Sequence, residues 1–415
     1  MDKVKRIFGG RIRQYSMVVA LVALVVIFNI ASGGRMVTSS NFQNLISGNS
    51  YVLVLAIGML MVIVIGQIDL SVGSVAGFSG MVMALAARDL HWPWWCAVLL
   101  SLAIGAAAGA WQGFWLAQVG IPGFITTLGG MMIFRGGVIW LSRSISVPAP
   151  SQLKMFGAGY LPDFGRNITG MNNSTLALGV LAILSFALSQ LRRRRRAAVL
   201  SGKTEELWPV VVRILLVAVV IAYLTWIFGT GRPGTSFPVP GLILAVLVVI
   251  YHTITQRTRF GRHIYAVGGN KTSAALSGVN IKKTYFLTML NMSLLAALAG
   301  IMFVGRSTAA GPSDGTGWEM DAIAAVYIGG AAVSGGVGTV FATMIGGLTM
   351  AVLNSGLMLM GVGADRTQVI KGFVLLAAVA LDVFNKSQGR PSIIGRLFPA
   401  KEKPAPETHE SGAKT

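Results

Sequence analysis

A few polar and charged side chains interrupt long apolar stretches of this sequence, and they are the first candidates for chemistry. They are Asp69, Ser71, Arg135, Asp321, Asn354 and Lys371. A charge is costly inside hydrocarbon, so it usually faces a water-filled path or a partner of opposite charge. We therefore predict that these six residues line a translocation path. Arg135 and Lys371 lie deepest, and each is expected to face a polar cavity or a carboxylate.

Asp69 breaks two apolar runs within G-Q-I-D-L-S-V-G-S, from Gly66 to Ser74. Two helix ends are expected to meet there, and the Asp69 carboxylate can accept hydrogen bonds from the free N–H groups of the second helix. This capping role is favoured over contact with a transported solute. The S-G-G-V-G turn at 334–338 occupies a similar position in its helix pair. It predicts a second discontinuous helix, with small-residue packing as the alternative for its glycines.

Other patterns that resemble catalytic or metal sites carry no chemistry. The single cysteine, Cys96, lies in an apolar run and offers neither an intrachain disulfide nor a pair of metal ligands. The tetrapeptide at Ser201–Thr204 ends like a phosphate-binding loop, but Ala197 stands where that loop requires glycine. The hydrophilic segments are too short for a separate enzyme core. We expect a protein that is not an enzyme, with no catalytic residue and no metal site.

Composition sets the scaffold that must hold these residues. Of the 415 residues 54% are hydrophobic and only 12% are charged. Runs of about 20 apolar residues can cross a bilayer as helices. Such runs, two of them split at the Gly- and Pro-rich turns 118–123 and 334–339, predict about twelve spans, give or take two. The fold class is therefore all-α: a polytopic bundle of about 10–12 transmembrane helices, some discontinuous, in one domain over 1–398. Residues 399–415 are expected to form a disordered tail.

Lys and Arg are distributed unevenly between the two sides of this bundle. With the N-terminus inside, segments 1–16, 192–207, 256–283 and 385–415 share one side and hold 23 of the 34 basic residues. The positive-inside rule places this side, with both termini, in the cytoplasm. The Arg-rich insertion at 192–207 is expected to face anionic membrane lipid. The net charge of +20 follows from this asymmetry, so nucleic acid is not an expected partner.

Residues 259–281 form a polar, basic stretch between two blocks of apolar sequence. Basic residues alternate there with glycines and with apolar side chains such as Ile264, Tyr265 and Leu276. A pure orientation signal would not need the apolar residues. T-S-A-A-L-S, at 272–277, can form a short amphipathic turn that fits a groove on a partner. The alternative is a solvated basic loop.

Four stretches of the chain resemble the monosaccharide permeases of bacterial ABC importers. They are T-R-F-G-R-H-I-Y-A-V-G-G-N with L-S-G-V-N (258–270 and 276–280), G-Q-I-D-L-S-V-G-S (66–74), I-P-G-F-I-T-T-L-G-G-M-M-I-F-R-G (121–136) and D-A-I-A-A-V-Y-I-G-G-A-A-V-S-G-G-V-G (321–338). The resemblance runs in order from about residue 40 to residue 384. Length, the W-Q-G-F-W at 111–115 and the extra spans around 192–207 are most similar to permeases for D-xylose.

This resemblance implies a subunit of an importer in the bacterial inner membrane. The expected partners are an ATPase subunit that binds ATP and Mg, a periplasmic sugar-binding protein and a second permease copy; this chain itself binds no cofactor. Segment 256–283 corresponds to the cytoplasmic coupling loop. Its expected coupling residues are Arg259, Gly261, Arg262, Tyr265, Gly268, Gly269, Asn270, Leu276, Ser277 and Gly278. Tyr265 and Leu276 are expected to be apolar anchors, and bulky residues at Gly268 and Gly269 to abolish uptake.

Some positions depart from the family pattern, and some alternatives stay open. Thr272 replaces an acidic residue, Ala275 an arginine and Ala342 a glycine. The sugar could be ribose, arabinose or galactose, or several sugars, instead of xylose. An ion-coupled carrier is the alternative of another class, although it would need more intramembrane carboxylates. On the opposite side of the membrane, segment 306–319 is expected to touch the binding protein with Trp318 as an anchor; an ordinary interfacial loop with a Trp at head-group level is the alternative.

Overall fold

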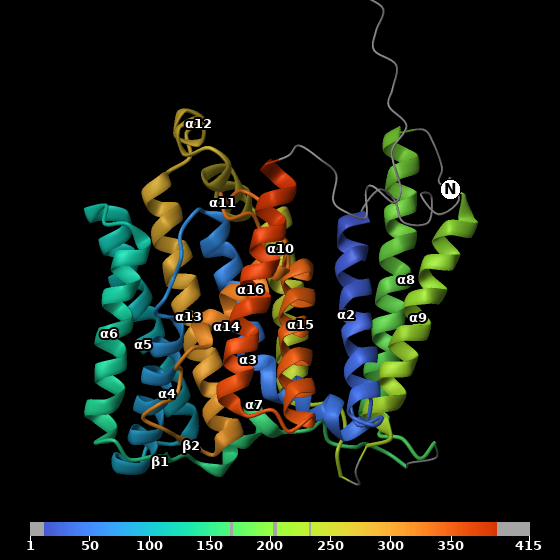
Figure 1. Ribbon diagram of the computed structural model, residues 1–415, viewed down its shortest axis with the longest axis horizontal. Helices are drawn as coiled ribbons and strands as arrows, with labels where there is room; N and C mark the ends of the chain where they lie inside the picture. The colour runs from blue at the N-terminus through green and yellow to red at the C-terminus, as the bar shows by residue number, and fades with distance from the viewer. Residues whose placement is uncertain (1–11, 167–168, 202–205, 232–233, 388–415) are drawn as a thin grey trace, which may run out of the picture.

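The computed structural model describes residues 12–166, 169–201, 206–231 and 234–387, and it forms a bundle of helices (Figure 1). The predicted tail at 399–415 lies outside these residues. The helices are α2 (Ile12–Ala31), α3 (Ser39–Val64), α4 (Val72–Asp89), α5 (Trp94–Phe114) with the π-helical turn η1 (Trp115–Val119), α6 (Gly123–Ser142), the 3₁₀ turn η2 (Ser151–Leu153), α7 (Lys154–Ala158), α8 (Asn173–Ser201), α9 (Leu207–Gly229), α10 (Val239–Arg257), α11 (Arg259–Gly269), α12 (Lys271–Leu276), α13 (Ile281–Ser307), α14 (Trp318–Ile328), α15 (Val340–Leu359) and α16 (Ala364–Ser387).

The predicted all-α class is confirmed. In the described residues the named strands are β1 (Val147–Pro148) and β2 (Ala309–Ala310), which pair antiparallel. Each apolar run expected to span the membrane contains a helix, and both splits at Gly-rich turns are correct. Eight helices within the described part of the chain are long and apolar enough to cross a membrane.

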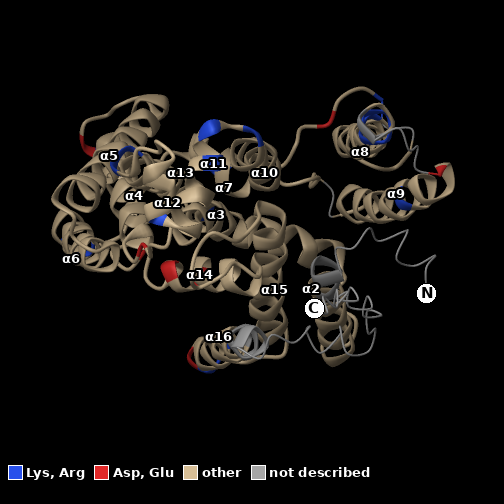
Figure 2. Cartoon of the chain, turned by 90° about the horizontal axis from the view of Figure 1, so that it is seen from above, with Lys and Arg blue, Asp and Glu red and all other residues tan. Residues whose placement is uncertain are grey.

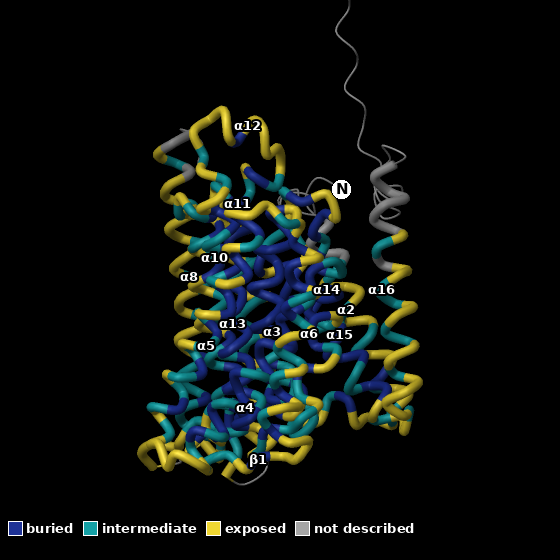
Figure 3. Tube along the Cα trace, turned by 90° about the vertical axis from the view of Figure 1, so that its left-hand side faces the viewer, coloured by how far each residue is buried: buried dark blue, intermediate teal, exposed yellow. Residues whose placement is uncertain are grey.

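The centre of the bundle is α3, with α13 packed along it. Nearly every residue of α3 from Val52 to Val64 is buried, because the helix is apolar on all sides and other helices surround it. Helix α13 packs against α3, α4 and α5. Figure 3 shows this buried column running through the middle of the molecule. The core thus holds the neighbouring polar segments in fixed positions.

Two of the apolar segments are interrupted helices. Helix α3 ends at Val64, and non-helical residues lead from there to the start of α4. Helix α14 has 11 residues. At 1.5 Å per residue it is only about 16 Å long, against a hydrocarbon thickness of about 30 Å. The stretch 311–317 precedes α14 and packs on the first turns of α4, where Gly73 lies against the Gly315 carbonyl.

This arrangement corrects two expectations about discontinuous helices. The ends of α3 and α4 do not meet at Asp69, since α4 begins about halfway along the bundle (Figure 1). The second interruption precedes α14 instead of lying in the 334–338 turn. That turn joins the end of α14 to α15 at one face of the bundle.

The basic segments gather on one face, as the charge count predicts. Helices α11 and α12 lie there, together with the start of α2, the end of α8 and the last described turn of α16 (Figure 1). The strand pair and α7 lie at the opposite face. We call these the α11–α12 face and the β1–β2 face. The arginine run 192–196 is not a loop, because α8 continues through it to Ser201.

Helices α8 and α9 form an antiparallel hairpin beside the bundle. They pack mainly on each other, where Gly179 sits directly against Thr225, and α9 also touches α3. Seen from above, the pair stands apart from the helices around α3 and α13 (Figure 2). The hairpin thus adds exposed apolar surface, and the end of α9 is buried where Phe228 packs edge-on against Phe42 of α3.

Candidate functional site

Helix α11 begins at a sequence-encoded cap and is strongly amphipathic. The Thr258 hydroxyl accepts a hydrogen bond from the Gly261 N–H at 3.1 Å, which caps the helix. Ile264 and Val267 are buried, whereas Arg259 and Arg262 are exposed. Gly261 has no room for a side chain, since a Cβ would lie 2.3 Å from the Ile254 carbonyl oxygen. The apolar side of α11 is therefore pressed onto the bundle, and its arginines point to solvent.

The end of α11 contacts both the end of α3 and the turn before α15. A Cβ on Gly268 would lie 1.7 Å from the Val64 carbonyl oxygen, so only glycine fits. That same oxygen accepts a hydrogen bond from the Gly336 N–H at 2.8 Å. The Tyr265 hydroxyl donates to the Gly338 carbonyl at 2.7 Å. Burial raises the pKa of the Tyr265 phenol, which stays protonated as this bond requires.

Helix α12 projects from the same face. Asn270 caps it by accepting from the Ser273 N–H at 2.9 Å, and Gly278 ends it in the left-handed region at φ 82°. Ala274 is buried, whereas Leu276 is 85% exposed. Gly269, Ser277 and Gly278 are exposed too. The predicted amphipathic turn is thus present, with an apolar side chain free on its outer surface.

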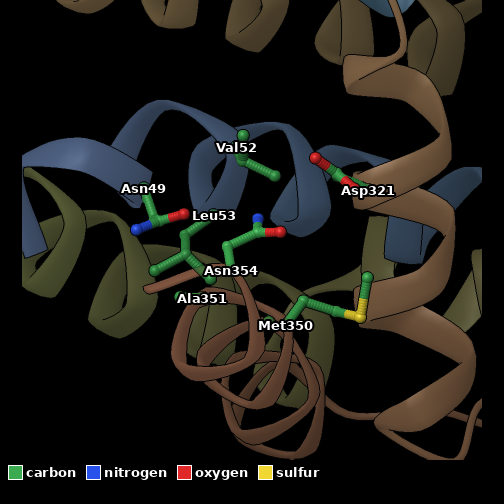
Figure 4. A pocket seen from close by; sticks show the side chains of 8 residues that line it. Asn49, Val52, Leu53, Asp321, Met350, Ala351 and Asn354 are labelled. Carbon is green, nitrogen blue, oxygen red and sulfur yellow. The ribbon is translucent and has the colours of Figure 1, made fainter. Parts of the chain in front are cut away.

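A narrow polar cavity lies between α3, α14 and α15. Asn49, Asp321 and Asn354 line it among apolar neighbours, and Figure 4 shows Asn354 between the other two. Its volume of about 10 Å³ is room for roughly one water, far less than a sugar needs. The Lys371 Nζ pairs with Asp321 Oδ1 at 2.6 Å. The expectation that Lys371 faces a polar cavity or a carboxylate is confirmed, and Asp321, Asn354 and Lys371 come together.

Asp69 and Ser71 belong to a second polar cluster, at the start of α4. Asp69 Oδ1 accepts from the Ser71 N–H at 2.8 Å and from the Ser71 hydroxyl at 2.6 Å, and Gln112 donates to that hydroxyl at 2.6 Å. Thr127 accepts from the Leu70 N–H at 3.1 Å. Asp69 is fully buried, as a residue that fixes this turn should be. These side chains hold the non-helical segment in place.

Arg135 joins α6 to the 311–317 segment. Its Nη1 donates to the Thr316 hydroxyl. Arg135 thus contacts the segment before α14, and the six path candidates make three separate sets of contacts. Among the described residues, no group of three or more His, Cys, Asp or Glu side chains could hold a metal ion.

The sequence missed some residues of these sites and misplaced one. Gln112 and Thr127 lie in motifs that were noticed, but their partners are distant in sequence. Asn49 is uncharged and is one of several amides in the first half of α3, so nothing distinguished it. Trp318 is not an exposed anchor: it is only 8% exposed and packs against Tyr51 and Phe303. The 311–317 segment turns into the bundle and takes Trp318 with it.

Comparison with known proteins places this architecture in a family. Residues 41–379 match the family model described as "Branched-chain amino acid transport system / permease component". The chain is 36% identical to the "Xylose transport system permease protein XylH" of Haemophilus influenzae, over 94% of this chain and all of that one. Its identity to the protein of that name from Escherichia coli K12 is 34%, over 90% and 92% of the two chains.

A relative with another printed name lies slightly further away. The chain is 32% identical to the "Ribose import permease protein RbsC" of Escherichia coli K12, over 89% of this chain and 94% of that one. No solved structure matches. The match to the family model covers most of the chain and includes α11, α12 and both interrupted helices. The chain therefore belongs to the family of permease components of branched-chain amino acid transport systems.

Proposed function

We propose that this chain is the permease subunit of an ATP-driven importer for a monosaccharide, most specifically D-xylose. The observation that carries the proposal is similarity along almost the whole chain to two permeases named for xylose. More distant relatives are named for ribose and D-allose, which supports a sugar in general. Ribose, arabinose and galactose are the competing substrates.

The α11–α12 face is the proposed docking surface for a separate ATPase subunit, which binds ATP and Mg. Helix α12 offers exposed Leu276, and α11 offers Arg259 and Arg262. Behind them, Gly268 and Tyr265 touch the end of α3 and the turn that leads into α15. A displacement of α11 therefore reaches two helices that line the polar cavity. Thr272 and Ala275 stand where the family commonly has an acidic residue and an arginine, and both are exposed. Because these two charges are absent, contact at α12 depends on shape more than on charge.

The remaining assignments follow from this orientation. The α11–α12 face and both termini lie in the cytoplasm of a bacterium, and the chain crosses the inner membrane many times. A periplasmic sugar-binding protein docks on the β1–β2 face, and a second permease copy completes the transporter. Membrane lipid surrounds the apolar exterior, including the α8–α9 hairpin.

Uptake in a strain that lacks its own permease tests the substrate. The chain is expressed with its ATPase and binding protein and offered labelled xylose, ribose, arabinose and galactose in turn. We expect ATP-dependent xylose uptake to be fastest. Faster ribose uptake would refute only the assignment of xylose as the substrate. Uptake that persists without the ATPase would refute the assignment to an ATP-driven importer.

The Asp321–Lys371 pair offers a test of the path. Lys371→Met leaves a half-buried carboxylate without its partner, which costs more than removing both charges. We expect the single change to reduce uptake strongly and Asp321→Asn with Lys371→Met to restore part of it. Equal uptake by the wild type, the single variant and the double variant would show that this pair has no role in transport.

A further inference from the structure

A groove of about 420 Å³ opens between the end of α5 and the start of α13 at the α11–α12 face. Lys282, Lys283, Asn280, Gln118 and Phe286 line it. The lysines lie in the first turn of α13, and Gln118 comes from η1. Figure 1 shows the upper ends of α5 and α13 next to each other, below α12. The groove lies at the edge of the coupling segment 256–283, but none of the named coupling residues on α11 and α12 lines it.

No carboxylate of the described residues pairs with the lysines of this groove. No Asp or Glu occurs between Glu206 and Asp314, nor between Asp89 and Asp163, so neither wall supplies a carboxylate from its own stretch of sequence. Within the described residues, no ion pair involves Lys282 or Lys283. Both lysines are exposed and their ammonium groups can reach a ligand. Two unpaired cations beside two amide side chains form a site suited to a phosphate group.

The lower wall of the groove is apolar. Phe286 lies one turn further into α13 and packs over Gly113, where a Cβ would come within 3.0 Å of its ring. Phe114, at the junction of α5 and η1, is 48% exposed, and Val119 is 50% exposed. Because α5 and α13 are both candidate membrane spans, these side chains lie where acyl chains begin. A soluble phosphate compound would gain nothing from this apolar surface.

We propose that the groove binds the headgroup of an anionic phospholipid from the leaflet on the α11–α12 face. Lys282 and Lys283 contact the lipid phosphate, and Gln118 and Asn280 hydrogen-bond to the headgroup. The acyl chains lie along Phe286 and Phe114. Asn280 also caps α13 by accepting from the Lys283 N–H at 2.9 Å, directly after α12. The bound lipid thereby steadies the junction between the membrane and the docking helix. The proposal needs the membrane setting but not the identity of the sugar.

Native mass spectrometry of the full chain with added lipid tests the site. The probes are phosphatidylglycerol, phosphatidylcholine and inorganic phosphate, in the absence of any ATPase. We expect preferential binding of phosphatidylglycerol, with affinity lower by about fivefold for each lysine removed in Lys282→Gln and Lys283→Gln. Lys154→Gln removes one exposed lysine at the opposite face and serves as the matched control, with no change expected.

Each other outcome contradicts the proposal. Equal affinity for phosphatidylcholine would show that charge is not recognised, and displacement of the lipid by millimolar phosphate would assign the site to a soluble anion. If the variant with both Lys282→Gln and Lys283→Gln folds poorly, the lipid affinities of the single variants and of Phe286→Ala are compared instead. Should these changes weaken capture of the ATPase while lipid affinity stays constant, the groove belongs to a protein contact.

Discussion

Helices α11 and α12 are neighbours in sequence and share a face, yet they relate to the bundle in opposite ways. Helix α11 buries Ile264 and Val267 and has backbone-to-backbone contact at Gly268. Helix α12 buries only Ala274 among its six residues and exposes Leu276. The difference fits two separate roles in the proposed coupling: α12 would meet the ATPase, and α11 would pass the displacement to α3 and to the turn before α15.

The largest effect on uptake is expected at Gly268, in contrast to its neighbour Gly269. Gly268→Ala places a methyl group 1.7 Å from the Val64 carbonyl oxygen, so α11 must move away from α3. Overpacking of this kind costs about 1–3 kcal/mol. We expect sugar uptake to be lost while the protein still reaches the membrane. Uptake assays and membrane immunoblots measure the two quantities.

Gly269→Ala is the matched control for that change. A Cβ at Gly269 meets nothing within 4 Å, so uptake should stay near the wild-type value. This outcome would show that Gly268 alone has the role that the sequence predicted for both glycines. Equal loss of uptake in both variants would show that α11 needs flexibility at its end and not contact with α3.

An intermediate effect is expected at α12. Leu276→Asp puts a charge at the exposed apolar position and should weaken capture of the ATPase by about 2 kcal/mol or more, as at other interface anchors. Pull-down of the ATPase by the tagged permease measures this. Thr272→Ala, on the same helix, should have little effect. If Leu276→Asp lowers the thermal stability of the isolated permease instead, α12 is part of the fold and not a docking element.

The smallest effect is expected at Tyr265. Tyr265→Phe removes the hydrogen bond to the Gly338 carbonyl and should lower stability by about 1 kcal/mol. Thermal unfolding in detergent provides the measurement, with Tyr223→Phe on α9 as control. Unchanged stability together with reduced uptake would show that the hydroxyl acts in coupling alone. If stability and uptake are both unchanged, the hydrogen bond to Gly338 contributes to neither.

Local signals made much of this site predictable from sequence. Thr258, Asn270 and Asn280 are good caps, and each accepts a hydrogen bond at the start of a helix. The Gly- and Pro-rich turns divided the long apolar runs correctly. Lys371 was expected to face a polar cavity or a carboxylate because an unpaired charge is costly in hydrocarbon.

The features that sequence did not reveal depend on contacts between distant segments. The partner of Gly268 is a carbonyl on α3, about 200 residues earlier, and no local pattern encodes that proximity. Asn49 is one of several amides in the first half of α3, and no local pattern shows that it meets α14 and α15 at the cavity. Trp318 has the polar neighbours of a surface loop, but aromatic stacking in the interior outweighs them.

The non-helical segment 311–317 has a consequence for where water enters. Backbone without helical hydrogen bonds is tolerated at membrane depth only where protein or water meets it. Gly315 is buried against α4, but Ser313 and Thr316 are exposed. The Thr316 hydroxyl bonds to Arg135 and to the Ser313 carbonyl, but lipid tails would offer no hydrogen-bond partner to the exposed Ser313 hydroxyl. The side of the chain that carries this segment, with Arg135 beside it, should therefore face water or another protein surface and not lipid.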